Sequence, residues 1–260
     1  MFDWFRRRRR RRLTSGRFPD SWRETIERNV PHYAELTGEE RSRIHDFVQI
    51  FVAEKVWEGC GGLVLDDEIR VTIAAQAGLL VLGLPHEYYR NVRTILVYPS
   101  TVITPDRPPG VFETPRIHSA SGIPILGEAQ SRGPVILVWD AVMLAARHPH
   151  DGHNVVYHEF AHKLDMLDGA ADGTPLLESR ASIDRWAEVC SHAFNDLRAR
   201  VEKGQRAFLD AYGATNEAEF FAVATEHFFD RPRQMLENEP DLYGVLRDFY
   251  RQDPAERSSV

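Results

Sequence analysis

The spacing of hydrophobic residues predicts helices in the first third of the chain. From Ser21 to about Leu84, apolar residues recur at three- and four-residue intervals, as on the buried face of a helix. Thr37 is followed three residues later by Glu40, a pairing that is typical of a helix N-terminus. The run 57–65 contains three glycines and is predicted as a turn. We therefore expect a small all-α subdomain over residues 21–90.

Two short apolar runs then favour β-strands. Thr94–Tyr98 is rich in β-branched residues and ends at a proline, and Val135–Trp139 has the strongest strand pattern in the chain. Residues 100–134 are rich in Pro, Gly and Ser, and we expect loops with short strands there. Helical spacing returns after residue 153, over about 154–167, 179–203, 216–230 and 240–250. Strands followed by helices predict an α+β domain over residues 91–254.

Composition indicates a globular protein of the cytoplasm. Hydrophobic residues make up 43% of the chain and charged residues 27%. No apolar run approaches the roughly 20 residues that a membrane-spanning helix needs, and no secretory signal is recognisable. The two cysteines, Cys60 and Cys190, are too few for a disulfide framework.

Charge is distributed unevenly along the chain. The net charge is −7, although Arg6–Arg12 is an unbroken run of seven arginines, so the remaining residues carry −14. An acidic body argues against nucleic acid as a specific partner, because phosphate binding needs a basic face. We expect residues 1–20 to form a flexible basic arm. Two interpretations of the arm stay open: a solvated terminus, or a segment whose arginines, with Trp4 and Phe5, touch anionic lipid or RNA.

The candidate chemistry lies in the run His158-Glu159-Phe160-Ala161-His162. Residues four apart in a helix lie on one face, one turn apart, so the two imidazoles can bind a single zinc ion. Glu159 is rotated away from that line and can hold the water at the open metal position and accept its proton. This pattern predicts a zinc-dependent hydrolase with about one Zn²⁺ per chain.

The third protein ligand cannot be chosen from spacing alone. Asp168 lies six residues after the second histidine, but a helix continuing through Leu164 and Met166 would turn it away. Glu217, Glu219 and Glu226 lie on the helix predicted over 216–230 and are the alternatives. Glu226 is seven residues from Glu219 and therefore shares its face, where it can accept a hydrogen bond from a zinc-bound histidine.

Two segments resemble a known peptidase family. Asn154–Asp165, which contains the histidine pair, and Asp210–Val223, which contains Tyr212 and Glu219, are similar to the Mlc titration factor A peptidases. That family is related to the catalytic domain of anthrax lethal factor. The resemblance implies a zincin-like catalytic domain with a mixed sheet and an active-site helix, and a metal site of the gluzincin kind.

The resemblance also implies a role for five side chains. His158, His162 and Glu219 correspond to the zinc ligands, and Glu159 corresponds to the general base. Tyr212, seven residues before the glutamate ligand, corresponds to an active-site tyrosine. A phenol at this position would donate a hydrogen bond to the oxyanion of the tetrahedral intermediate.

Two functions follow as hypotheses. The first is a zinc peptidase, aminopeptidase-like, that hydrolyses short peptides, with the strand at Val135–Trp139 either pairing with the substrate backbone or forming ordinary core. The second is a regulatory binding protein, because the resembling family binds the Mlc repressor of the glucose phosphotransferase system. The zinc pattern favours the enzyme, since a binding module has no need of a general base.

Overall fold

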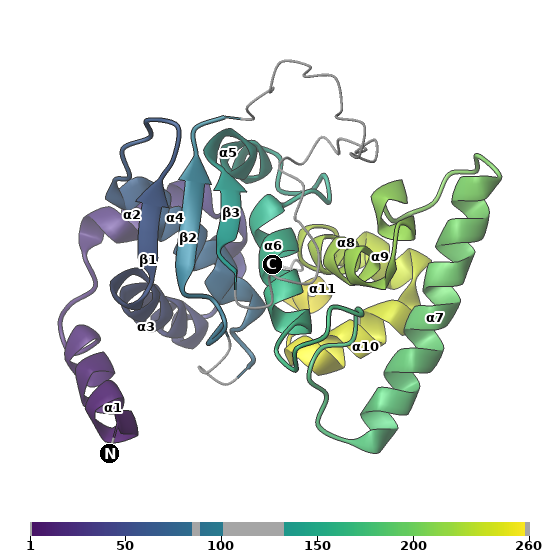
Figure 1. Cartoon of the computed structure of the whole chain (residues 1–260), viewed down its shortest axis with the longest axis horizontal. Helices are drawn as coiled ribbons and strands as arrows, with labels where there is room; N and C mark the ends of the chain where they lie inside the picture. Colours follow the sequence, from purple (N-terminus) through teal and green to yellow (C-terminus); the bar gives the residue numbers. More distant parts are fainter. Residues whose placement is uncertain (1, 85–88, 101–132, 258–260) are drawn as a thin grey trace, which may run out of the picture.

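The computed structural model describes residues 2–84, 89–100 and 133–257 (Figure 1). Its helices before the last strand are α1 Phe2–Leu13, α2 Asp20–Asn29, η1 Pro31–Glu35, α3 Gly38–Glu54 and α4 Asp67–Leu80. The strands are β1 Val56–Gly59, β2 Thr94–Tyr98 and β3 Val135–Val138. The helices that follow are α5 Trp139–Arg147, α6 Val155–Asp165, α7 Arg180–Glu202, η2 Ala211–Ala214, α8 Glu217–Asp230, α9 Pro232–Asn238, α10 Pro240–Tyr250 and α11 Pro254–Arg257. The predicted α+β class is confirmed.

The three described strands form one sheet in the order β1-β2-β3, and all of them run parallel. The resemblance implied a mixed sheet, but each pairing among the described strands is parallel. Alternate residues of β2 and β3 are buried, as the two-residue period of a strand requires: Ile95, Val97, Val135 and Leu137. Residues 101–132, where loops and short strands were predicted, lie outside the described part of the chain.

The segment predicted as all-α contributes a strand to this sheet. β1 pairs with β2, with Val56 opposite Thr94, where a glycine-rich turn was expected. Gly59 ends this strand opposite Val97. A glycine is required there because the chain folds back tightly, and a Cβ would collide with the carbonyl oxygen of Leu63. By contrast, the predicted cap of α3 is confirmed: Thr37 Oγ1 accepts the N–H of Glu40, and the Glu40 carboxylate accepts the N–H of Thr37.

Two further elements differ from the sequence expectation. The arginine-rich arm, expected to be flexible, is the helix α1, and Arg10 joins it to Glu54 at the end of α3 through two hydrogen bonds of 2.9 and 2.6 Å. Trp139, expected to end a strand, begins α5 instead. Among the described residues, no helix is long and apolar enough to cross a membrane.

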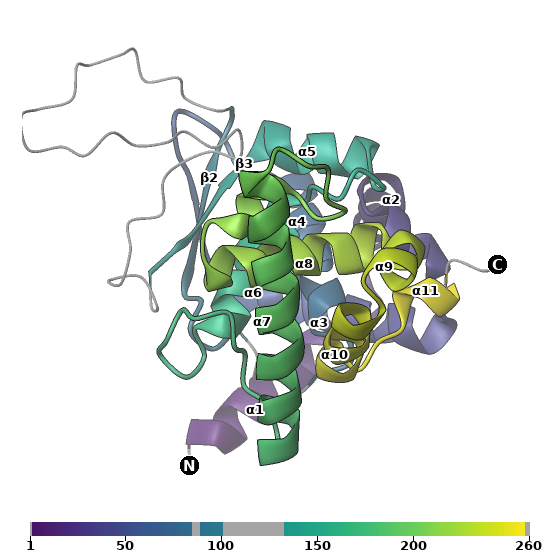
Figure 2. The ribbon, with the colours of Figure 1, turned by 90° about the vertical axis from the view of Figure 1, so that its right-hand side faces the viewer.

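Packing of aromatic side chains fixes the two helices at the centre of the molecule. Phe160 of α6 is fully buried, with its ring centroid 4.7 Å from that of Tyr89 and 5.8 Å from that of Phe51. On α8, the ring centroid of Phe228 lies 5.6 Å from that of Tyr250 of α10. Figures 1 and 2 show α6 and α8 side by side, with the sheet beyond α6 and α7 beyond α8.

Candidate metal centre

Helix α6 presents both histidines from a firmly capped first turn. The Asn154 side-chain oxygen accepts hydrogen bonds from the backbone N–H groups of Val156 at 3.0 Å and Tyr157 at 3.1 Å. Asn154 is therefore the N-cap at which α6 begins. His158 and His162 follow on one face, and both are buried. The helix ends at Asp165, two residues sooner than the spacing predicted.

Helix α8 brings its carboxylates to the same face. Asn216 caps the helix by accepting the N–H of Glu219 at 2.9 Å, which fixes the turn that carries this glutamate. Glu226 lies two turns further along and is 6% exposed. α6 and α8 pack directly against each other, so the imidazoles face both carboxylates.

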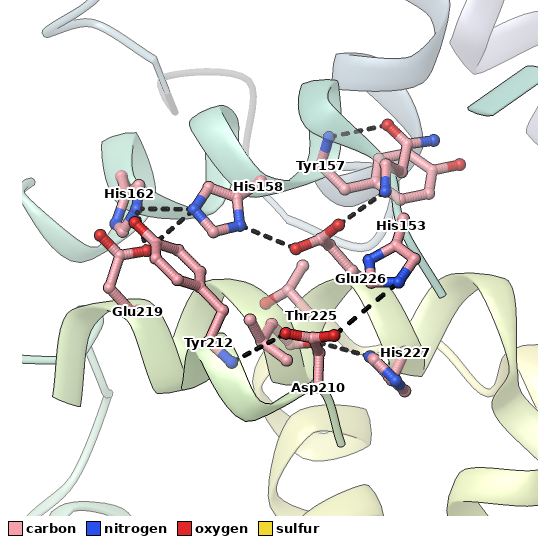
Figure 3. Close-up of polar contacts among 12 residues, drawn as sticks. His153, Tyr157, His158, His162, Asp210, Tyr212, Glu219, Thr225, Glu226 and His227 are labelled. Carbon is pink, nitrogen blue, oxygen red and sulfur yellow. Dashed lines mark hydrogen bonds and ion pairs between the residues drawn. The ribbon is translucent and has the colours of Figure 1, made fainter. Parts of the chain in front are cut away.

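Three ligand atoms converge at this contact (Figure 3). Nε2 of His158 lies 3.0 Å from Oε2 of Glu219, Nε2 of His162 lies 3.4 Å from the same oxygen, and the two Nε2 atoms are 3.2 Å apart. Zinc binds imidazole nitrogen and carboxylate oxygen at about 2.0–2.2 Å, so a tetrahedral site has ligand atoms about 3.3–3.5 Å apart. The observed separations are at most about 0.3 Å shorter than this range, so the donor set fits a zinc ion after a small adjustment of the side chains, with a fourth position left for water or substrate.

A second carboxylate, that of Glu226, contacts the His158 ring nitrogen that faces away from the ligand cluster. Oε1 of Glu226 lies 2.7 Å from His158 Nδ1, and Oε2 accepts the backbone N–H of Asn154 at 2.6 Å. Because an ionised carboxylate only accepts hydrogen bonds, the imidazole places its proton on Nδ1 and leaves the Nε2 lone pair for a metal. Nδ1 of His162 is buried without a hydrogen-bond partner in the described part of the chain.

The electrostatics of the cluster favour a bound cation. Burial opposes protonation of His158, but Glu226 and Glu219 together raise its pKa well above the usual value. Burial would raise the pKa of Glu219, yet hydrogen bonds to the two histidines hold it well below its ordinary range. Carboxylates thus surround two imidazoles in a largely buried site, and a divalent cation would balance their charge.

The two residues expected to do chemistry lie at this cluster. Burial raises the pKa of Glu159, although His158 and His162 oppose the increase. Tyr212 is half-buried on η2, and its ring centroid is 5.9 Å from that of His158. Its backbone N–H donates to Asp210 at 2.8 Å, and Figure 3 shows its hydroxyl end directed toward Glu219 and His162.

The other candidate ligands lie elsewhere. Asp168 is exposed, and its carboxylate accepts the N–H of Ala170 at 3.0 Å. Glu217 is exposed at the start of α8. Among the described residues, the group that could hold a metal is His158, His162 and Glu219.

Two residues on α6 support the site without having been assigned a role from the sequence. Lys163 is buried and donates through Nζ to the carbonyl of Gly133, which precedes β3, at 3.2 Å. Asp165 accepts the N–H of Gly173 at 3.0 Å, so it joins α6 to a neighbouring loop. The contact between Lys163 and Gly133 could have been predicted from a lysine at a buried position of a helix, because a buried ammonium group needs a hydrogen-bond acceptor.

Two histidines one turn apart on one helix, together with a glutamate from a second helix, form a ligand set that is typical of mononuclear metallohydrolases. Residues 4–251 match the family described as Glucose-regulated metallo-peptidase M90, and the chain belongs to this family. It is 36% identical to Uncharacterized protein slr2042 of Synechocystis, over 97% of this chain and 90% of that protein. It is 30% identical to Mlc titration factor A of Salmonella gallinarum and of Salmonella enteritidis, over 89% of this chain and 86% of each relative.

Proposed function

We propose that this metallopeptidase is a zinc-dependent peptidase of the gluzincin kind, with His158, His162 and Glu219 as its zinc ligands. The observation that carries the proposal is the convergence of two imidazole nitrogens and one carboxylate oxygen within 3.0–3.4 Å of one another. Zinc would contribute Lewis acidity, which polarises the scissile carbonyl and lowers the pKa of a water molecule.

The remaining side chains divide the work of hydrolysis. Glu159 accepts the proton of the attacking water and passes it to the leaving amine, a role supported by the raised pKa of its carboxyl group. Tyr212 donates a hydrogen bond to the oxyanion of the tetrahedral intermediate, supported by its hydroxyl pointing toward the ligand cluster. Glu226 orients His158 and keeps its proton on Nδ1.

For the substrate, we propose short peptides and an aminopeptidase-like preference, on the basis of the resemblance to the Mlc titration factor A peptidases. β3 is the outermost of the described strands on its side of the sheet, and it leads into α5, which precedes α6. An extended peptide could pair with such a strand by β-strand addition. We propose the cytoplasm as the location, since Cys60 and Cys190 are both free thiols.

A second candidate function is the binding of a transcriptional repressor. It is favoured by the name of the Salmonella relatives, Mlc titration factor A. In that case, this chain would bind an Mlc-like repressor of the glucose phosphotransferase system, and hydrolysis would be secondary.

One substitution separates the two functions. Glu159→Gln preserves side-chain shape and both histidines, so zinc content should stay near one per chain while turnover of short chromogenic peptides falls by about 10²-fold or more. Tyr212→Phe should also keep the metal and slow turnover by about 10²-fold. Full activity in Glu159→Gln would contradict the mechanism, and repressor binding by a wild-type protein that cleaves no peptide would establish the second function.

A further inference from the structure

The basic helix α1 is attached to the body through Arg9 and Arg10. Arg10 makes the bidentate contact with Glu54, and a guanidinium nitrogen of Arg9 lies 3.4 Å from the carbonyl oxygen of Ala53. Both partners lie in the last turn of α3. Figure 1 shows α1 projecting past α3 at the rim of the molecule, with the N-terminus at its far end.

The N-terminal part of α1 carries exposed aromatic rings beside exposed arginines. Trp4 and Phe5 are each 58% exposed and contact each other edge to face, with ring centroids 5.0 Å apart. The guanidinium of Arg8 lies over the Trp4 ring at 5.4 Å. Six of the seven consecutive arginines are exposed, all but Arg10. Large apolar rings in water are costly, and their position next to cations is typical of helices that lie in a lipid interface.

Charge is separated between this helix and the rest of the chain. Helix α1, with seven arginines and Asp3, carries a net charge of +6, and the rest of the chain carries −13. A flat anionic surface can be reached by the projecting helix while the acidic body stays away from it. A long polyanion such as RNA extends beyond so short a helix and would meet the acidic body. At 12 residues, α1 is about 18 Å long, so it can lie on a bilayer and is too short to cross one.

We propose that α1 is a docking helix for the surface of an anionic phospholipid bilayer. Trp4 and Phe5 insert at the level of the headgroups, and the exposed arginines pair with lipid phosphates. The contact of Arg10 with Glu54 sets the angle at which the helix leaves the body. The inference is independent of the proposed peptidase function, because no residue of α1 belongs to the metal centre.

Vesicle flotation with the full-length protein tests the proposal. The probes are vesicles of pure phosphatidylcholine and vesicles with 30% phosphatidylglycerol, each at low and high NaCl. We expect binding to the anionic vesicles alone, and its loss at high salt because exposed charges are screened. Each basic residue near an anionic surface contributes about fivefold in affinity, so replacing four arginines with glutamine should weaken binding by about 600-fold. The four lie outside the contact with α3: Arg7, Arg8, Arg11 and Arg12.

Matched variants distinguish the effect of the α1 surface on vesicle binding from the effect of the protein's net charge. Replacing four exposed arginines elsewhere by glutamine changes the net charge equally and should leave vesicle binding within about twofold; suitable positions are Arg43, Arg147, Arg180 and Arg198. Trp4→Ser with Phe5→Ser should weaken binding about tenfold or more. Circular dichroism of each variant verifies folding.

Three results would overturn the proposal. Equal binding to neutral vesicles would remove the electrostatic basis, and undiminished binding by the α1 arginine variant would place the lipid contact elsewhere. Binding of a single-stranded RNA oligonucleotide through α1, without any binding of anionic vesicles, would assign the helix to nucleic acid.

Discussion

Replacing Glu226 by Gln tests how the centre prepares His158 for a metal. The carboxylate is buried and accepts two hydrogen bonds, from His158 Nδ1 at 2.7 Å and from the backbone N–H of Asn154 at 2.6 Å. A glutamine has one oxygen and one NH₂ group, so it can accept only one of them. If the oxygen serves Asn154, the NH₂ group faces Nδ1 and favours the tautomer with its proton on Nε2, where the metal should bind.

The size of the effect follows from that geometry. Loss of a carboxylate that orients a metal-bound histidine typically weakens metal binding 10- to 100-fold, which corresponds to about 1.4–2.7 kcal/mol. If the amide oxygen serves His158 instead, the buried N–H of Asn154 loses its acceptor, at a cost of about 1–3 kcal/mol in the free energy of unfolding. The variant therefore loses metal affinity, stability of the metal-free fold, or part of each.

Competition for Zn²⁺ against a chromophoric chelator measures the first quantity, and urea unfolding of the metal-free protein measures the second. Glu217→Gln is the matched control, because it makes the same change at an exposed position of the same helix. The reasoning is refuted if Glu226→Gln keeps zinc affinity within twofold of wild type and unfolds at the same urea concentration as the control.

Three further outcomes are expected. Glu219→Ala should lower zinc affinity strongly in the same chelator assay while Asp168→Ala changes it little, and the reverse order would contradict the proposed ligand set. Burial opposes protonation of His32, but its hydrogen bond to Asp230 at 3.1 Å and the carboxylate of Glu35, 3.8 Å away, raise its pKa to about 9. Its stabilising effect is therefore complete below pH 6.5 and lost as the pH rises through 9, so wild type should lose about 1–3 kcal/mol more than His32→Gln over that range in urea unfolding. Gly173→Ala should lower the free energy of unfolding by about 2 kcal/mol or more, since φ is 75° and a Cβ would collide with a backbone carbonyl. Gly204→Ala, with φ 63° and open space around it, should lower it by about 1 kcal/mol. Equal losses for the two variants in thermal or urea unfolding would contradict the steric argument.

Local pattern predicted the elements whose signals are contained in neighbouring residues. The capping pair Thr37 and Glu40 and the two apolar strands depend on interactions within a few residues, and the structure has them where the sequence placed them, apart from Trp139. β1 was missed because residues 57–65 were predicted as a glycine-rich turn. Only the pairing of Val56–Gly59 with β2 makes this segment a strand. The helical form of α1 was missed for a similar reason, since Arg10 finds its carboxylate partner 44 residues away.

The sequence by itself determined the histidine pair and the general-base candidate, because the 3.6-residue period of one helix sets the relative positions of His158, Glu159 and His162. It left the third ligand open, since Glu217, Glu219 and Glu226 lie on another helix and no spacing relates the two. The tertiary packing of α6 against α8 decided their positions: Glu219 at the histidine nitrogens, Glu226 behind His158, and Glu217 in solvent. Periodicity orients residues within a helix, whereas the rotation of one helix against another is set by the packing of their buried side chains.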